Sequence, residues 1–461
     1  MNATDLAKLD HDSLVALILK QAAIIDALKA QIEELTRSGR RQAAPFSKGT
    51  RVKDPKKPGR KPGEGTFRRR MAPSPEQLSE PPIEVPIAEP ACTRCGGELA
   101  LERHEDVSIT DLPEVPRPRV RLFRLAVHRC RGCGVTARGR HPEVAADQRG
   151  ATAHRFGPRL LAAAHHLHYG LGVPVRKLPA MLRLLCGVRI TQGAITLDAI
   201  AGAQGAVGAR YRRLCESIRG SAYVHTDDTG WREGGRPKWL MTFVTDTATV
   251  YQVRSRHRNE EVREQIPADY AGVMITDRGK SYEASELAGV RQQKCLSHVL
   301  RSISEVLEGK VGAARRFGLK LKGLLRRSLE LWHERRAGPA ADFEEKARGV
   351  ALELTRHLRD RALGDVDNQR LLDGLGRWHD SGSLVRFLRE PTIEPTNNRA
   401  ERALRPAVIA RKVSQCTKGA RGTAAFEAWT SVLVTLARTV SGVGLLDAVV
   451  GLVRSTHPQP A

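Results

Sequence analysis

The chain contains 461 residues, which is enough for two to four domains with buried cores. Its 76 Lys and Arg residues outnumber its 51 Asp and Glu residues, and the net charge of +25 favours nucleic acid or, less often, an anionic membrane surface as partner. Charges interrupt every apolar run before the roughly 20 residues of a spanning helix, no signal pattern opens the chain, and eight cysteines suggest no disulfide framework. We therefore expect a cytoplasmic protein.

Region 1–36 is predicted to be a coiled-coil helix. Two sets of residues recur every seven positions: Leu14, Gln21, Leu28 and Leu35, and Ile18, Ile25 and Ile32. This repeat is typical of a coiled-coil seam, through which we expect a homodimer or higher oligomer. A lone amphipathic helix packed on its own domain would give the same stripe.

Region 37–85 is predicted to be a basic linker. Between positions 37 and 70 it carries 13 Lys or Arg residues against two acids, so it cannot bury a core. Arg60 and Lys61 lie in a Pro-flanked basic hexapeptide, 58–63, of the kind that enters the minor groove of A·T-rich DNA. The alternative is a plain charged linker that attracts DNA without sequence preference.

Two C-x-x-C pairs in region 86–150 predict a zinc ribbon. Cys92 and Cys95 form the first pair, Cys130 and Cys133 form the second, and a strand-like segment, 120–128, lies between them. Four thiolates can surround one Zn²⁺ ion tetrahedrally. Because this fills every position on the metal, we expect a structural zinc.

Region 151–218 is predicted to be a helical domain. Apolar residues recur at helical spacing, and the sequence Thr-Gln-Gly at 191–193 predicts a cap and turn before the helix that holds Ile195, Leu197 and Ile200. Short helices in so basic a chain are compatible with a DNA-binding helix-turn-helix unit. A plain helical connector is the alternative.

Region 219–304 begins with two adjacent acids. A short apolar strand, 222–224, precedes Asp227 and Asp228, and we expect the Thr-Gly-Trp sequence that follows to break it, which leaves an acidic tip. An isolated Asp pair is more often a solvated turn.

A second strand end in this region also carries an acid. Two β-rich runs in 238–254, joined at Asp246, complete a hairpin sheet, and the apolar run 271–275 leads to Asp277. If these strands are neighbours, Asp227 and Asp277 come within reach of one cation.

The remaining chain is predicted to be mainly helical. Region 305–392 contains helices at 319–336 and 343–363, with Trp332, Trp378 and Phe387 as core. In region 393–461, Thr396 or Asn397 can cap a helix that holds Glu401, Arg402 and Arg405. By itself Glu401 would ordinarily form a surface salt bridge.

Three carboxylates that converge from two strands and a helix suit two-metal phosphoryl transfer. Ligation by carboxylates alone favours Mg²⁺ or Mn²⁺ over zinc. Arg402 and Arg405 could hold the scissile phosphate or its neighbours. Arg411 and Lys412, further along the same segment, are expected to contact DNA as well.

The chain resembles the transposases of the insertion sequence 66 family. The resemblance rests on D-D-T-G-W at 227–231, T-D-R-G-K-S-Y at 276–282, C-L-S-H at 295–298 and N-N-R-A-E-R-A-L-R-P at 397–406. It implies a multidomain α+β protein whose core is a DDE-type, RNase H-like fold with a helical insertion. Asp227, Asp277 and Glu401 would be its triad. Asp228 stands where family members usually have Glu, and Arg278 where they usually have Gly.

Cys295 and His298 look like the C-x-x-H pair of that family. A second zinc would need two more ligands, and none is obvious nearby in the sequence, so a phosphate or core contact is favoured for His298. Asn398 is a further candidate accessory residue. Cys186, Cys215 and Cys416 are interpreted as packing residues.

Two functions remain open from the sequence. The first is an enzyme that cuts transposon ends and joins the 3′-hydroxyls to target DNA, in a bacterial cytoplasm near the nucleoid and with small accessory proteins that the resemblance implies. The second is a non-catalytic DNA-binding protein, either a regulator or a degenerate transposase. The intact set of three acids favours the enzyme.

Overall fold

The computed structural model describes most of the chain beyond residue 117 and parts of what precedes it. The described residues are 10–22, 24, 25, 28, 74–78, 81–86, 91, 92, 94–99, 101, 102, 104, 107–109, 117–145, 148–150, 154–338, 341–359, 362–440 and 442–456. The chain divides into two compact units, one of residues 46–117 and one of residues 1–45 with 118–461.

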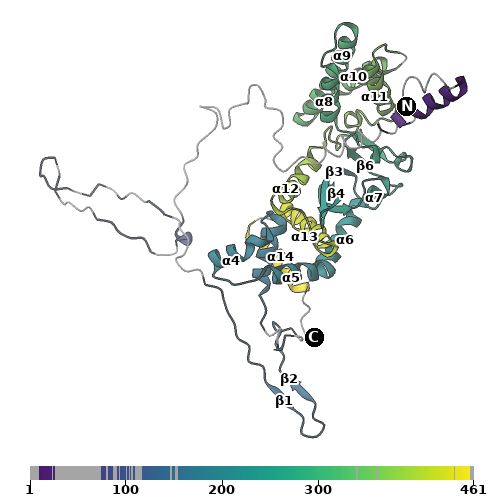
Figure 1. The fold of residues 1–461 in the computed structure, drawn as a ribbon. Coiled ribbons are helices and arrows are strands. Elements are labelled where there is room, and N and C mark those ends of the chain that lie inside the picture. Colours follow the sequence, from purple (N-terminus) through teal and green to yellow (C-terminus); the bar gives the residue numbers. More distant parts are fainter. Residues whose placement is uncertain are drawn as a thin grey trace. The chain divides into compact units, whose positions relative to one another are not determined.

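The larger unit is built on a five-stranded mixed sheet, which confirms the predicted α+β class (Figure 1). The spatial order is β5-β4-β3-β6-β7. Strands β3, β4 and β5 pair in antiparallel fashion, whereas β6 runs parallel to both β3 and β7. The strand bounds are Tyr223–Glu233, Arg236–Val244, Thr249–Arg254, Val273–Thr276 and Arg291–Lys294 for β3 to β7.

The first strand of the sheet is longer than predicted. The expectation that Thr229, Gly230 and Trp231 break the strand is wrong, because β4 pairs with every residue of β3 from His225 to Glu233. The chain reverses only at Gly234 and Gly235, whose φ angles of 56° and 82° suit a two-residue hairpin turn. Asp227 and Asp228 therefore lie within a paired strand and not at its tip.

Helices cover both faces of the sheet (Figure 1). Because successive strand residues point to opposite faces, Val224 and Met274 join one core, and Tyr223, Val273 and Ile275 join the other. The first core includes helices α3 (Pro158–His165), α4 (Leu178–Cys186), α5 (Gln192–Gln204), α6 (Ala206–Arg219), α13 (Ala420–Thr439) and α14 (Val443–Thr456). As predicted, Thr191 caps α5, since its Oγ1 accepts a hydrogen bond from Ala194 N at 3.2 Å.

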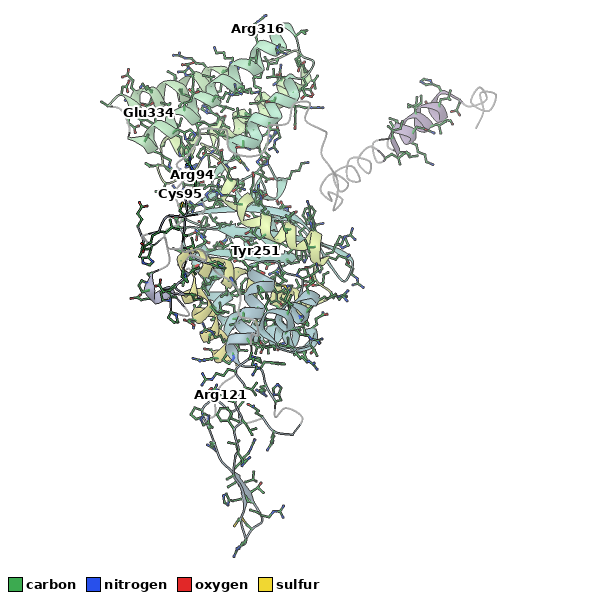
Figure 2. The ribbon with its side chains drawn as sticks, turned by 90° about the vertical axis from the view of Figure 1, so that its left-hand side faces the viewer. Arg94, Cys95, Arg121, Tyr251, Arg316 and Glu334 are labelled. Atoms are coloured by element: carbon green, nitrogen blue, oxygen red, sulfur yellow. The ribbon has the colours of Figure 1, made fainter. Side chains whose placement is uncertain are left out.

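The helices of the second core follow β7 in the chain. They are α8 (Leu296–Leu307), α9 (Gly312–Ala337), α10 (Phe343–Leu358) and α11 (Val366–Asp380). Of the predicted core residues, Trp378 and Phe387 are buried and Trp332 is partly buried. In Figure 2, Arg316 and Glu334 mark the position of α9, and Tyr251 of β5 marks the sheet. The view shows that α9 lies in a layer separate from the sheet.

Two smaller predictions fall on parts that are only partly described. Residues 11–22 are helical and leave Ile18 and Leu19 exposed, whereas Ile32, Leu35, Arg60 and Lys61 lie outside the described residues. In place of one strand over 120–128, a short hairpin joins β1 (Val127–Arg129) to β2 (Thr136–Arg138).

In the part of the chain that the structure describes, no helix combines the length and apolarity needed to cross a membrane.

Two helical glycines are expected to respond oppositely to alanine. A Cβ at Gly202 in α5 would lie 2.8 Å from the buried ring of Trp429, so Gly202→Ala should destabilise the protein by about 1 to 3 kcal/mol. A Cβ at Gly323 in α9 would meet nothing within 4 Å, so Gly323→Ala should stabilise by about 0.5 to 1 kcal/mol. Urea denaturation followed by circular dichroism measures both, and a stabilised Gly202→Ala protein would contradict this packing.

Candidate active site

Asp227 and Asp277 are brought together by the parallel pairing of β3 with β6. The paired residues are Tyr223 with Val273, Val224 with Met274 and His225 with Ile275, a constant offset of 50 positions. Asp227 and Asp277 have the same offset and lie two positions beyond the last of these pairs, Asp227 within β3 and Asp277 directly after β6. The carboxyl ends of parallel strands are where open sheets place ligands. The backbone hydrogen bonds between β3 and β6 therefore determine where these two predicted site residues lie relative to each other.

Glu401 is carried to this edge by α12 (Asn398–Ser414), in whose first turn it lies. The residue before the helix, Asn397, is fully buried, and its Nδ2 donates a hydrogen bond to Thr226 O at 2.7 Å. Its Oδ1 accepts one from His225 Nδ1 at 3.3 Å, and burial lowers the pKa of His225 to about 4, which keeps that ring neutral. Asn397 therefore holds the start of α12 against the residue next to Asp227.

The carboxylates of the site act on one another electrostatically. Burial, together with the negative charges of Asp228, Asp277 and, more weakly, Glu401, raises the pKa of Asp227 to about 8. A hydrogen bond from Asp228 N to Asp227 Oδ1 at 3.0 Å opposes this rise. A bound divalent cation would relieve this repulsion. Among the described residues, however, Asp227, Asp277 and Glu401 do not form a group of possible ligand atoms within 4.8 Å of one another.

Asp228 has a different partner from Asp227. Neighbouring residues of a strand face opposite sides, and Asp228 Oδ1 lies 3.3 Å from Nδ1 of His257. The other ring nitrogen of His257 lies 3.3 Å from Ser281 Oγ. Asp228 therefore contacts His257 on the face of β3 opposite to that of Asp227.

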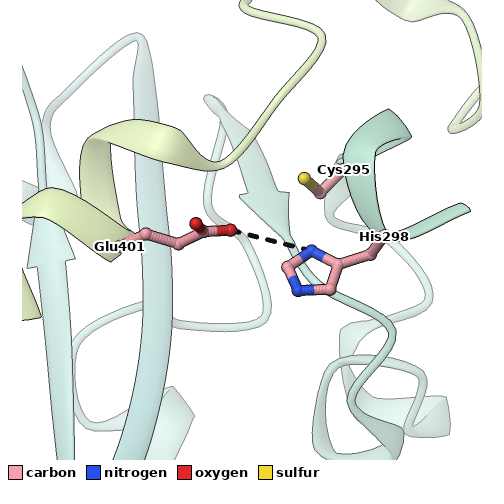
Figure 3. A group of neighbouring side chains, drawn as sticks. All are labelled: Cys295, His298 and Glu401. Atoms are coloured by element: carbon pink, nitrogen blue, oxygen red, sulfur yellow. Dashed lines mark ion pairs between the residues drawn. The ribbon is translucent and has the colours of Figure 1, made fainter. Parts of the chain in front are cut away.

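Glu401 lies near the C-x-x-H pair, Cys295 and His298. Among the described residues, Cys295, His298 and Glu401 form one group whose metal-binding atoms are all within 4.8 Å of one another. Figure 3 shows Glu401 reaching from α12 toward His298, whose Nδ1 is 3.8 Å from Glu401 Oε1. The Cys295 thiol, and then the Glu401 carboxylate, raise the pKa of His298. The expectation that no further ligand lies near Cys295 and His298 is therefore wrong, since α12 supplies one from 103 positions beyond His298.

The predicted DNA-contacting residues of α12 occupy two settings. Arg402, Arg405 and Lys412 are exposed. Arg411 is partly buried, and its Nη1 donates hydrogen bonds to Thr229 Oγ1 at 3.1 Å and to Gly230 O. Arg411 thus ties the end of α12 to β3, while the exposed residues remain available to a ligand.

The two C-x-x-C pairs have the same local backbone geometry. Cys92 N donates to Gly97 O and Gly96 N to Cys92 O, and Cys130 N donates to Val135 O and Gly134 N to Cys130 O. Gly96 and Gly134 both have φ near 73°, which favours glycine at the position after each pair. Backbone amides lower the pKa of Cys92 and of Cys130, which favours the metal-binding thiolate.

Sequence reasoning missed the residues that position the acids. Asn397 belongs to the motif that carries the family resemblance, but the sequence predicts for it only a helix-capping role. It does lie at the N-cap position of α12, yet its side chain makes no capping hydrogen bond and contacts Thr226 O instead. Asn398, the predicted accessory residue, is exposed. No local signal could single out His257, because its contact with Asp228 exists only in the folded sheet.

Acids gathered at the carboxyl edge of a mixed sheet, in a chain of net charge +25, are typical of proteins that process nucleic acids with a divalent cation. The model of the Transposase IS66 family matches residues 153–425, which is more than half of the chain, and the chain belongs to that family. The resemblance seen in the motifs is confirmed. Membership implies a DNA-binding transposase that uses a divalent metal. No curated protein matches the chain.

The raised pKa of Asp227 predicts a pH-dependent stability without metal. Between pH 4 and pH 8 the folded protein holds this proton while the unfolded chain, with a pKa near 3.8, has lost it. Stability from this group is therefore greatest at low pH and falls as pH rises toward 8. Asp227→Asn removes this effect, so relative to the parent it should gain a few kcal/mol, at roughly 1.4 kcal/mol per pH unit.

Urea midpoints of the two proteins in EDTA at pH 5 and pH 8 measure this gain. The exposed Asp269, which lies outside the site, provides Asp269→Asn as the matched control. An Asp227→Asn gain of the same size at both pH values would show that the carboxyl does not titrate in this range.

Proposed function

We propose that the protein cuts the ends of a mobile DNA element and transfers the freed 3′-hydroxyls to target DNA, with Asp227, Asp277 and Glu401 as the triad. The observation that carries the proposal is the parallel pairing of β3 with β6, whose offset of 50 positions is also that between Asp227 in β3 and Asp277 directly after β6. The mutual effect of the acids on the pKa of Asp227 supports it, because carboxylates crowded in this way suit a divalent cation.

The sheet supports an RNase H-like core as the finer fold. Its three consecutive antiparallel strands are followed by two parallel strands on the opposite side of β3, and a helix that carries the third acid packs on β3 and β4. In this interpretation α9 to α11, which lie within residues 305–392, are the insertion before the final acid. This interpretation rests on topology and on family membership.

We assign different roles to the residues at the metal site. Asp227, Asp277 and Glu401 would hold Mg²⁺ or Mn²⁺, since ligation by carboxylates alone favours these ions. When bound, such ions supply activation of the attacking hydroxyl and stabilisation of the leaving oxygen. Asp228, which contacts His257, adds negative charge from the opposite face of β3 to the one that carries Asp227. Asn397 fixes the start of the Glu401 helix relative to Asp227.

DNA would be held by positive charge beside these acids. Exposed Arg402 and Arg405 follow Glu401 in α12 and offer guanidinium groups for phosphates, and exposed Lys412 lies further along the same helix. Such contacts fix the position of the backbone without reading the sequence. Arg60 and Lys61 of the linker are proposed to add minor-groove contacts.

The amino-terminal regions would assemble the complex. The exposed apolar residues of the helix at 11–22 suit a coiled coil that joins two or more copies. The matching geometry at the two C-x-x-C pairs supports one structural zinc with Cys92, Cys95, Cys130 and Cys133 as ligands. Small accessory proteins are further proposed partners. The alternative function is a non-catalytic DNA-binding protein.

Asp227→Asn is expected to abolish Mg²⁺-dependent nicking of the element's end DNA. Loss of a metal ligand removes several kcal/mol of transition-state stabilisation, so the rate should fall by at least about a thousandfold. Asp269→Asn, an exposed acid of the same domain, is the control. Nicking is measured on labelled end DNA with and without Mg²⁺. A parent that binds this DNA but never cuts it would favour the non-catalytic alternative, and an Asp227→Asn protein that cuts normally would refute the triad.

Cys130→Ser is expected to lower the zinc content by about one ion per chain. A closed tetrahedral site depends on all four thiolates, and losing one lowers affinity sharply. Zinc is measured by atomic absorption after dialysis of the full chain. Cys186→Ser serves as control, because Cys186 is exposed, contrary to the packing role predicted for it. Equal zinc content in Cys130→Ser and the parent would exclude the ribbon.

A further inference from the structure

We propose that Cys295, His298 and Glu401 form a second metal site, for a soft divalent cation such as Zn²⁺, and that this cation withdraws Glu401 from Asp227 and Asp277. The first half concerns the three side chains alone. The second half rests on the proposed function, because it assumes that Glu401 completes the triad.

The first support is the distance between the ligand atoms. Cys295 Sγ, a His298 ring nitrogen and a Glu401 oxygen are all within 4.8 Å of one another. Tetrahedral zinc with bonds of about 2.0 to 2.3 Å requires separations of roughly 3.5 Å between ligand atoms. Movement of about 1 Å closes the group, and the exposed Glu401 side chain can supply it.

The second support is the way in which the backbone fixes the ligand-bearing segments. Cys295 directly follows β7, and its N–H donates to Thr276 O at 2.8 Å. Leu296 N donates to Pro395 O at 2.9 Å, and Asn397 N donates to Cys295 Sγ at 3.2 Å. The start of α8, which carries Cys295 and His298, is therefore tied to the segment that leads to Glu401.

The third support is an unsatisfied atom. Nδ1 of His298 is buried and has no hydrogen-bond partner in the described part of the chain. Its 3.8 Å separation from Glu401 Oε1 is too long for a hydrogen bond. A cation between these atoms would satisfy both, whereas an unpartnered buried nitrogen costs about 1 to 3 kcal/mol in desolvation.

The ligand types decide which metal the site prefers. Thiolate and imidazole favour zinc, while sites made of carboxylates favour magnesium. Three protein ligands also leave one position on zinc open to water or a substrate oxygen. Because Glu401 belongs to both ligand sets, zinc at this site and magnesium at the triad compete for one side chain. The protein would therefore be held inactive by free zinc.

Zinc content of the full chain tests the site. After dialysis against about 1 μM free Zn²⁺, Cys295→Ser and His298→Gln should each hold one ion fewer than the parent, and Cys186→Ser should match the parent. His298 is partly exposed, so His298→Gln keeps the test valid if substitution of the buried Cys295 impairs folding. A His298→Gln protein with the zinc content of the parent overturns the site.

A competition assay tests the withdrawal of Glu401. With Mg²⁺ present, added Zn²⁺ should inhibit nicking by the parent, and His298→Gln should need at least tenfold more zinc for half-inhibition relative to its own zinc-free rate. Equal inhibition of the two proteins overturns the withdrawal even if the zinc count supports the site. A parent that never nicks in zinc-free Mg²⁺ refutes the proposed function instead, and the zinc count still decides the site.

Discussion

The site depends on one buried amide. Asn397 bonds to the backbone of β3 and to His225 through its side chain, and to Cys295 through its N–H, so it joins three segments that are far apart in the chain. Each bond lies in the interior, where a lost partner costs more than the bond itself contributes. Because α12 begins at the next residue, the position of Glu401 follows from this contact. The third acid is thus set by hydrogen bonding and the first two by strand pairing.

Electrostatics and packing oppose each other at this edge of the sheet. Burial and three neighbouring acids make ionised Asp227 unfavourable, although the whole chain is strongly basic. The nearby arginines do not relieve the cost, because Arg411 is directed to the backbone of β3 and Arg399 pairs with Asp246 and Glu394. Without a metal the fold therefore favours the protonated form of Asp227, and a divalent cation bound at the site would favour the ionised form. A site kept unstable in this way is typical of functional positions.

The sequence predicted what depends on local pattern. Alternating and apolar runs predicted β4, β5 and β6, and the spacing of acids after strands predicted the placement of Asp277. The length of β3 could not be predicted, because it depends on pairing with β4 across the whole hairpin, and a Thr-Gly-Trp sequence is a turn signal elsewhere. The contacts of Asn397, His257 and Glu401 also join residues from separate segments, so tertiary packing decides them.

The hydrogen bond from Leu296 to Pro395 closes the helical insertion at its base, and this placement has a consequence for biosynthesis. Asp227 in β3 and Asp277 directly after β6 can take their places once β6 has paired with β3, but Glu401 lies 124 positions beyond Asp277. At the usual 5 to 20 residues per second, translation of that stretch takes about 6 to 25 s. During this interval a nascent chain contains Asp227 and Asp277 but not yet Glu401. Its ability to cut DNA would begin only after the insertion has emerged and closed.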